Sequence, residues 1–140
     1  TRSGFMRKGL YVRVITFGTF DLFHVGHLRI LERARALGTS LSVGVSSDEL
    51  NEQKKGKTPV CALEDRMAIL RALRCVDDVF VEHALELKAQ YIQEQAADIM
   101  VMGEDWRGKF DDMKAHCEVV YLERTPSIST TALLEVIRKP

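Results

Sequence analysis

The stretch that decides the fold is VRVITFGTFDLFHVGHLRILERARALG, which runs from Val12 to Gly38. Its opening run, Val12–Phe17, is rich in β-branched side chains and predicts a buried strand that ends at a glycine. From Val25 to Leu37 the apolar side chains recur at helical spacing, and Gly38 is expected to end this helix as a C-cap. A strand, a short loop and a helix in this order form the first part of a β-α-β unit.

The rest of the chain repeats this alternation. Further strands are expected at Leu41–Ser46, Val76–Val81, Ile99–Met102 and Glu118–Leu122, and further helices at Leu63–Arg74, at Ala84–Gln95 and from a cap at Ser129 to about Arg138. The polar, lysine-rich segment Asn51–Pro59 is expected to be a loop, and Trp106–Ala115 a short helical or irregular piece.

This order of elements predicts an α/β fold. We expect a Rossmann-like, doubly wound, five-stranded parallel sheet with helices on both faces, because strands that alternate with helices pair in parallel through right-handed crossovers. Ligands of such sheets bind beyond the carboxyl ends of the strands. The residues that follow each strand are therefore the candidates for chemistry.

Length and charge set the outer limits. Residues 1–10 are expected to be an N-terminal extension, in which Thr1 to Phe5 precede a native start at Met6, and residues 11–140 a single domain. Twenty Lys and Arg balance twenty Asp and Glu, so the formal net charge is zero. A neutral chain is not expected to coat nucleic acid or an anionic membrane, although a local cationic pocket remains compatible with it.

The cysteines and the apolar runs point to the cytoplasm. Cys61, Cys75 and Cys117 have neither CxxC nor CxH spacing, so they predict neither a disulfide framework nor a zinc site, and we expect reduced thiols. The apolar runs are too short to span a membrane, and no signal peptide is recognised.

A candidate phosphate site follows the first strand. Gly18 lets the backbone approach a ligand closely, and His24 and His27 flank the start of the next helix, where unpaired N–H groups favour phosphate. Three positions apart, the two histidines can face one direction, and Gly26 keeps the wall between them low. The pattern matches neither GxxxxGK[ST] nor GxGxxG. A solvated cap or half of a metal site are the alternatives.

These residues carry a family resemblance. GTFDLFHVGHLRILERARALG resembles the nucleotidyltransferase superfamily with the HxGH motif. Three further segments, VMGEDWRGKF at 101–110, CEVVYLERT at 117–125 and ISTT at 128–131, resemble the small bacterial glycerol-3-phosphate cytidylyltransferases, and more loosely the phosphocholine and phosphoethanolamine cytidylyltransferases. The similarity runs from about Val12 to the C-terminus, so residues 11–140 would be one nucleotidyltransferase domain.

The resemblance implies a reaction. The family joins CTP, with Mg²⁺, to a small phosphomonoester, best matched by the phosphorylated polyol sn-glycerol 3-phosphate, and releases pyrophosphate by direct displacement at the α-phosphorus. The acceptor phosphate is already an anionic nucleophile, so the enzyme must mainly supply alignment and positive charge. The resemblance also implies a homodimer and a product, CDP-glycerol, used for a cell-wall or capsule polymer. Other pairs on the same fold are phosphoethanolamine or phosphocholine with CTP, and FMN with ATP.

Residue roles follow by resemblance, position by position. The catalytic set would be His24, His27, Lys54, Lys57 and Arg124. The nucleotide would be bound by Gly18, Thr19, Phe20, Gly26, Asp77, Gly103, Asp105, Arg124, Thr125, Ile128, Ser129 and Thr130. The acceptor would be bound by Asp21, Arg66, Arg74 and Lys88, and no residue is assigned to a metal.

Several of these residues also have purely structural explanations. Asp21 would orient the acceptor or, through water, Mg²⁺, but it could instead cap the following helix. Lys54 and Lys57 could belong to a solvated loop. Arg66 and Arg74 lie eight positions apart, about two turns of one helix, and are expected to share a face.

Three departures from the family pattern are visible. Pro126 and Ser127 replace an acidic residue and a glycine, Leu85 stands where the glycerol-phosphate enzymes commonly carry a tryptophan, and the loop Lys54–Ala62 is one residue longer. The last two bear on the identity of the acceptor. A non-catalytic nucleotide-binding protein on the same fold is the remaining alternative, but its expected mark, loss of one histidine of the motif, is absent from the sequence.

Overall fold

The computed structural model describes residues 11–125 and 128–139, and its centre is a five-stranded parallel sheet. The strands are β1 (Arg13–Gly18), β2 (Ser40–Ser46), β3 (Asp78–Glu82), β4 (Ile99–Gly103) and β5 (Glu118–Leu122). Their order is β3-β2-β1-β4-β5, and every neighbouring pair is parallel. The predicted doubly wound Rossmann-like sheet is confirmed. The strand order reverses beside β1, which is where such sheets bind ligands. The expected extension over residues 1–10 and the Pro126–Ser127 departure lie outside the described residues.

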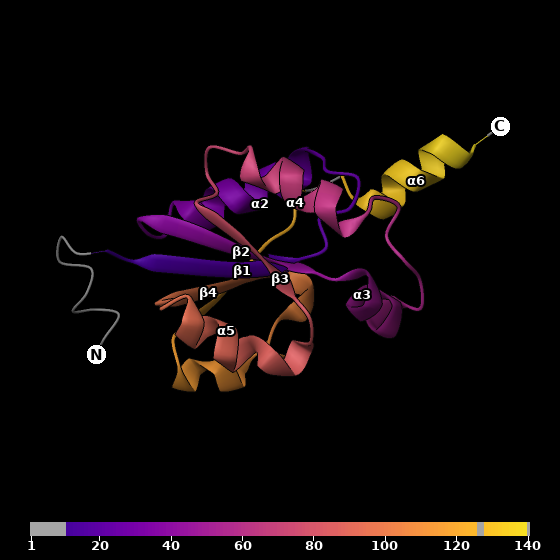
Figure 1. Cartoon of the computed structure of the whole chain (residues 1–140). Helices are drawn as coiled ribbons and strands as arrows, with labels where there is room; N and C mark the ends of the chain where they lie inside the picture. The colour runs from indigo at the N-terminus through magenta and orange to yellow at the C-terminus, as the bar shows by residue number, and fades with distance from the viewer. Residues whose placement is uncertain (1–10, 126–127, 140) are drawn as a thin grey trace.

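Helices cover both faces of the sheet (Figure 1). Helices α2 (Val25–Arg35) and α4 (Leu63–Arg71) lie on one face, and α5 (Lys88–Glu94) lies on the other with the short 3₁₀ segment η3 (Asp111–Ala115). Two further 3₁₀ turns, η1 (Leu85–Leu87) and η2 (Glu104–Trp106), follow β3 and β4. The buried side chains form two clusters, one between the sheet and α2 and α4 and the other between the sheet and α5.

The structure corrects the expectation for the lysine-rich segment. The loop expected at Asn51–Pro59 is wrong over its first part, because helix α3 spans Asp48–Lys55. The side chain of Ser47 caps the helix by accepting a hydrogen bond from the Leu50 amide at 3.1 Å, and Gly56 ends it in the left-handed conformation with φ of 72°. The apolar pattern of the sequence did not indicate this helix, because α3 is mostly polar and buries few apolar side chains.

The ends of two other helices also differ from expectation. Helix α2 ends at Arg35 with Ala36 as its C-cap, so the prediction that Gly38 caps it is wrong. Gly38 is needed for close packing instead, because a Cβ there would lie 2.4 Å from the carbonyl oxygen of Val12. Helix α4 ends at Arg71, before the predicted end at Arg74.

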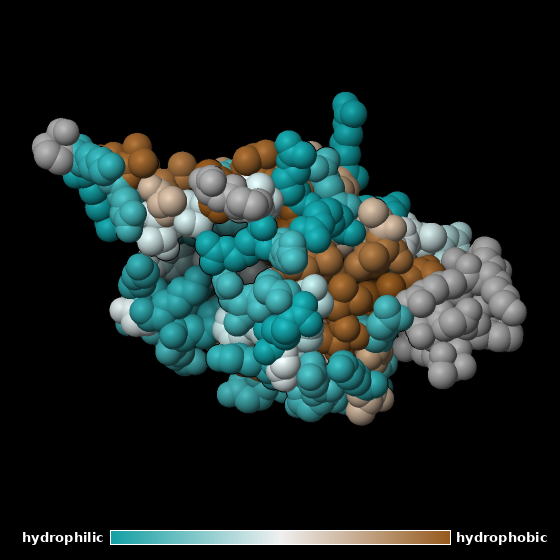
Figure 2. Space-filling model, turned by 180° about the vertical axis from the view of Figure 1, so that it is seen from behind, coloured by the Kyte–Doolittle hydropathy of each residue, from teal (hydrophilic) through white to brown (hydrophobic). Residues whose placement is uncertain are grey.

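Helix α6 (Thr130–Arg138) projects from the body of the molecule near the carboxyl ends of the strands (Figure 1). Val136 and Ile137 on this helix are 65 % and 71 % exposed. Figure 2 shows hydrophobic side chains running along this projecting arm. Within the described ranges, no helix combines the length and the apolar character needed to cross a membrane.

Candidate active site

A cavity of about 530 Å³ opens at the carboxyl ends of the strands. Its walls come from the loop after β1, from α3 and the segment that follows it, from the ends of β3 and β4, and from α6. The predicted site residues that line it are Gly18, Thr19, Phe20, Asp21, His27, Lys54, Lys57, Lys88, Gly103, Asp105 and Thr130. One cavity therefore brings together residues that lie more than a hundred positions apart in the sequence.

The loop after β1 turns sharply. Phe20 and Leu22 have φ of 55° and 49°, in the left-handed region that side chains other than glycine rarely adopt. Gly18 makes room for this turn, because a Cβ there would lie 2.8 Å from the Phe20 ring. Thr19 fixes the loop from the other side by donating a hydrogen bond to the Asn51 side chain at 2.7 Å. The turn directs the backbone of this loop into the cavity.

The Asp21 carboxylate holds the segment between α3 and α4. It accepts hydrogen bonds from the amides of Val60 at 2.7 Å and Cys61 at 2.8 Å, and from its neighbour Leu22 at 3.1 Å. Both carboxylate oxygens are engaged by these donors. The alternative that Asp21 caps α2 is wrong, because the N-cap of that helix is His24. Asp21 thus fixes one wall of the cavity.

The two histidines of the motif form a reciprocal cap on α2. Their rings stack with centroids 3.8 Å apart and planes 22° apart. Nδ1 of His24 accepts a hydrogen bond from the Gly26 amide at 3.0 Å, and Nδ1 of His27 accepts one from the His24 amide at 3.2 Å. Because Nδ1 accepts in both rings, the neutral form of each carries its proton on Nε2. Both histidines can therefore donate from Nε2.

Gly26 and Thr130 complete this arrangement. A Cβ on Gly26 would lie 2.8 Å from the His24 ring and 3.0 Å from the Ile128 side chain, so only glycine leaves the ring room to cap the helix. The Thr130 hydroxyl donates to the carbonyl oxygen of Asp21 at 3.0 Å and lies 3.4 Å from Nε2 of His24, from which it can accept. Ser129 caps α6 by accepting from the Ala132 amide at 3.1 Å.

Burial keeps both histidines neutral at pH 7. It lowers the pKa of His24, and it lowers the pKa of His27 from 6.5 to about 4, with smaller contributions in the same direction from the charges of His24 and Lys55. A neutral His27 offers a hydrogen bond instead of a positive charge. Positive charge in the cavity must therefore come from the lysines.

Three lysines from α3 and the turn after it line the cavity: Lys54, Lys55 and Lys57. Burial lowers the pKa of both Lys54 and Lys55. Lys55 was not predicted, although its Nζ lies 3.5 Å from the Thr19 hydroxyl. Lys55 could have been identified only by predicting α3, because Asn51 and Lys55 share a face only when the segment is helical.

A buried ion pair contributes to the wall of the cavity. The Lys88 ammonium pairs with the carboxylate of Glu82, a cavity residue that the sequence did not single out. At the rim, Arg124 pairs with Asp105 at 2.9 Å, and both side chains are exposed. Thr125 follows Arg124 in the chain and is not among the described residues that line the cavity. Among the described residues, no cluster of His, Cys, Asp and Glu is arranged to hold a metal ion.

The sequence model described as cytidylyltransferase-like matches residues 15–136, nearly all of the chain that carries this geometry. The chain belongs to the cytidylyltransferase-like family. The predicted resemblance and its enzyme class, nucleotidyltransferase, are thereby confirmed.

Individual relatives of this family sharpen the comparison. The chain is 51 % identical over 125 residues to a glycerol-3-phosphate cytidylyltransferase of Bacillus subtilis. The aligned residues cover 89 % of this chain and 96 % of the relative. The chain is 46 % identical to the enzyme of that name from Staphylococcus aureus, over 86 % of this chain and 91 % of the relative. An FAD synthase of Pyrococcus abyssi is 39 % identical over 67 % of this chain and 64 % of the relative.

Solved structures agree on the fold of the cytidylyltransferase-like chain. A lipopolysaccharide core biosynthesis protein from Thermoplasma volcanium superposes with a TM-score of 0.71 at 25 % sequence identity, over 82 % of this chain and 98 % of that chain.

Arg66 does not face the cavity of this cytidylyltransferase-like chain, contrary to its expected role on the acceptor. Its side chain is 1 % exposed and donates to the carbonyl oxygens of Thr19 at 3.0 Å, Ser46 at 2.9 Å and Cys61 at 3.0 Å. Nη2 of Arg66 donates to the Asp48 carboxylate at 2.6 Å. Because four of its hydrogen bonds go to the protein, Arg66 holds the walls of the site together, and its expected contact with the acceptor stays a prediction.

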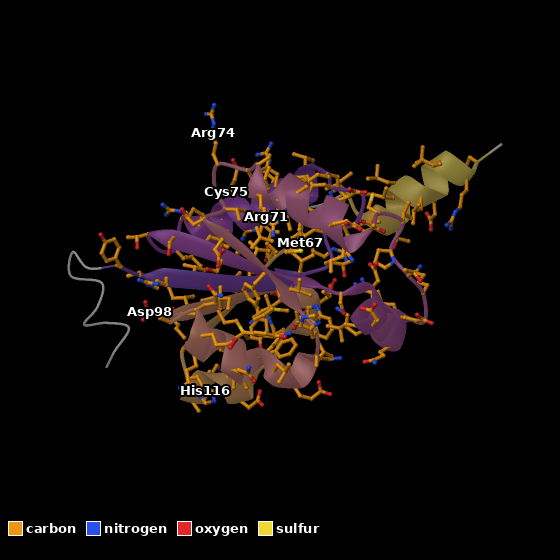
Figure 3. All side chains as sticks on the ribbon, viewed as in Figure 1. Met67, Arg71, Arg74, Cys75, Asp98 and His116 are labelled. Carbon is orange, nitrogen blue, oxygen red and sulfur yellow. The ribbon has the colours of Figure 1, made fainter. Side chains whose placement is uncertain are left out.

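Arg74 and Asp77 lie at the other end of the sheet, so the structure does not bring them to the cavity with the other predicted site residues. Their expected roles at the acceptor and the nucleotide stay predictions. Arg74 follows the end of α4 and therefore does not share a helix face with Arg66. Figure 3 shows it projecting from the surface, far from α3. The Asp77 carboxylate accepts from the Leu41 amide at 2.8 Å and lies 3.5 Å from Arg35.

Replacement of Arg66 by methionine tests its structural role. Arg66→Met should lower the free energy of unfolding by about 3 kcal/mol, because three carbonyl oxygens, one of them in a buried pair, lose their donor and Asp48 loses its ion-pair partner. Urea unfolding followed by circular dichroism measures the change. Arg71→Met, at an exposed position of the same helix, is the matched control and should change it by less than about 0.5 kcal/mol. If the Arg66→Met protein is as stable as wild type but has lost turnover, the structural role is contradicted and Arg66 is assigned to acceptor binding instead.

The lowered pKa of His27 predicts a pH dependence of stability. Between about pH 6.5 and pH 4 the unfolded chain binds a proton at this residue that the folded chain does not, so stability falls as the pH is lowered through that window. His27→Asn can keep the bond from the His24 amide through Oδ1 while removing the titration. Its melting temperature should therefore fall less between pH 7 and pH 5 than that of the wild type. An equal fall in both proteins would contradict the assignment.

Proposed function

We propose that the protein transfers the cytidylyl group of CTP to glycerol 3-phosphate, giving CDP-glycerol and pyrophosphate. The observation that carries the proposal is the 51 % identity to a glycerol-3-phosphate cytidylyltransferase over 96 % of that relative's length. The cavity supports it, because His27 and a group of lysines line it, and His24 stacks on His27 at the same helix start; such groups are suited to a triphosphate and a phosphomonoester.

The proposed reaction needs no general base. An oxygen of the acceptor phosphate attacks the α-phosphorus of CTP, and the bond from that phosphorus to the bridging oxygen breaks, so that its electron pair leaves with pyrophosphate. The Nε2–H group of His27, and that of His24 once it leaves the Thr130 hydroxyl, would donate to the phosphate oxygens, on which negative charge accumulates in the transition state. Lys54, Lys55 and Lys57 would neutralise the charge of the triphosphate and of the departing pyrophosphate.

Magnesium enters this proposal as part of the substrate, the Mg²⁺ complex of CTP. The acidic residues among the described cavity lining are already engaged: Asp21 by backbone amides, Glu82 by Lys88 and Asp105 by Arg124. Mg²⁺ is usually held by substrate phosphates and water together with one or two carboxylates. The donor set therefore does not fit a resident metal held by the protein alone.

The first prediction of this proposal concerns the substrates. With CTP, Mg²⁺ and glycerol 3-phosphate the protein should release pyrophosphate and form CDP-glycerol, which coupled phosphate detection and mass spectrometry measure together. Replacing CTP by ATP should abolish most of the release. Faster release with ATP and FMN would instead assign the protein to the reaction named for its FAD synthase relatives.

The second prediction concerns Lys55. Lys55→Met should lower kcat/KM for CTP by about ten- to a hundredfold, because a lysine near the Thr19 hydroxyl can contact the charged phosphates directly. Lys114→Met is the matched control, since this lysine is exposed on η3 and pairs only across the surface with Asp111 at 3.8 Å. Unchanged turnover in Lys55→Met, with melting temperatures equal in both variants, would exclude Lys55 from the site.

A further inference from the structure

The Lys88 ammonium occupies a cage of three groups. Its side chain is 3 % exposed and pairs with the Glu82 carboxylate, whose side chain is 1 % exposed. The ammonium nitrogen lies 4.3 Å from the centre of the Phe17 ring and 4.7 Å from that of Phe110. Aromatic faces together with a carboxylate are the surroundings in which proteins bind alkylammonium ligands. Here a side chain of the protein takes the place of the ligand.

The fold holds both partners of this pair in place. Glu82 is the last residue of β3, and its carbonyl oxygen accepts from the amide of Ser47, the N-cap of α3, at 3.0 Å. Lys88 begins α5 after the η1 turn. The next residue after Glu82, His83, donates its amide to the Tyr91 hydroxyl at 3.0 Å, which ties the turn to α5. The pair is therefore anchored from both elements.

The same pair lines the cavity that also contains His27. Asp21, Glu82 and Asp105 are the acidic residues of the described lining, and each already has partners. A positively charged headgroup that entered beside Lys88 would meet another ammonium and no available carboxylate. Such like-charge contacts disfavour a ligand, most strongly in sites shielded from water.

We propose that Lys88 fills an ammonium site of its own protein, and that Glu82, by holding it there, makes the cavity select phosphomonoesters with neutral, hydroxyl-bearing tails and reject those with cationic tails. Glu82 is thus a positioning residue that acts through Lys88. A polyol hydroxyl can accept a hydrogen bond from the Lys88 ammonium, whereas the ammonium of phosphoethanolamine cannot. The inference rests on the proposed cytidylyltransferase function and specifies the substrate class of that site.

Lys88 is the better residue to change first. The Glu82 carboxylate also raises the pKa of Lys54, opposing the larger lowering by burial, so removing Glu82 alone would disturb the lysines expected to contact the nucleotide. Removing Lys88 leaves the carboxylate and the two aromatic rings available for an external ammonium. The test therefore uses Lys88→Met and the double variant that carries Glu82→Gln as well.

The measurement is kcat/KM for glycerol 3-phosphate and for phosphoethanolamine at saturating CTP. Wild type should strongly prefer glycerol 3-phosphate. In Lys88→Met, kcat/KM for phosphoethanolamine should rise by at least about tenfold, because the cage accepts its ammonium. In the double variant that value should lie between wild type and Lys88→Met, because repulsion and attraction are both gone. Lys114→Met and Glu86→Gln, at exposed positions, should keep the wild-type ratio.

The outcomes separate this inference from the proposed function. If wild type releases no pyrophosphate with glycerol 3-phosphate, the proposed function fails. The selection against cationic tails can then still be tested, by comparing the neutral phosphomonoester that the protein uses best with the analogue of it that carries an amino group. If phosphoethanolamine turnover does not rise in either variant, or falls in parallel with glycerol 3-phosphate, the pair is only structural and the inference is overturned. The Lys88→Met variant leaves the Glu82 carboxylate buried without its partner and could therefore fail to fold. In that case the double variant, which removes both charges, gives the test through its ratio of kcat/KM for phosphoethanolamine to kcat/KM for glycerol 3-phosphate.

Discussion

The guanidinium of Arg66 is the constraint on which the site depends. It lies beneath the cavity and donates to carbonyl oxygens in the loop after β1, at the end of β2 and in the segment before α4. These segments lie far apart in the sequence, and each contributes a wall. Only a planar group with several fixed donors can satisfy them together, so lysine could not replace it. Asp21 adds a second tie between two of the same segments.

Charge in the cavity is arranged by burial as much as by composition. The chain is neutral as a whole, yet four lysines line one cavity in which each acidic residue of the described lining is already paired or hydrogen-bonded. Burial keeps the histidines neutral and lowers the pKa of Lys54, Lys55 and Lys88. A bound triphosphate would reverse that shift by placing negative charge beside these groups. Zero net charge is therefore compatible with recognition of a small polyanion.

The sequence was sufficient for the sheet, because β-branched runs alternate with apolar helical spacing over nearly the whole chain. It was not sufficient for α3, where the polar face dominates and only the Ser47 cap and Gly56 mark the ends. Arg66 and Arg74 show a second limit, since a spacing argument holds only while the helix continues, and α4 ends between them. Glu82 was missed because a glutamate at the end of a strand looks like a boundary residue, and only its contact with Lys88 reveals otherwise.

The HVGH motif is first a local structure and only then a chemical one. The first histidine caps the helix through Nδ1, the second accepts from the backbone amide of the first through its own Nδ1, and glycine gives the capping ring its space. These bonds leave Nε2 of each neutral ring as a donor, so the protonation pattern needed at a phosphate follows from helix capping. Through Thr130 the start of α6 lies against the first of these rings. This contact therefore links the capping histidine to the start of the projecting helix.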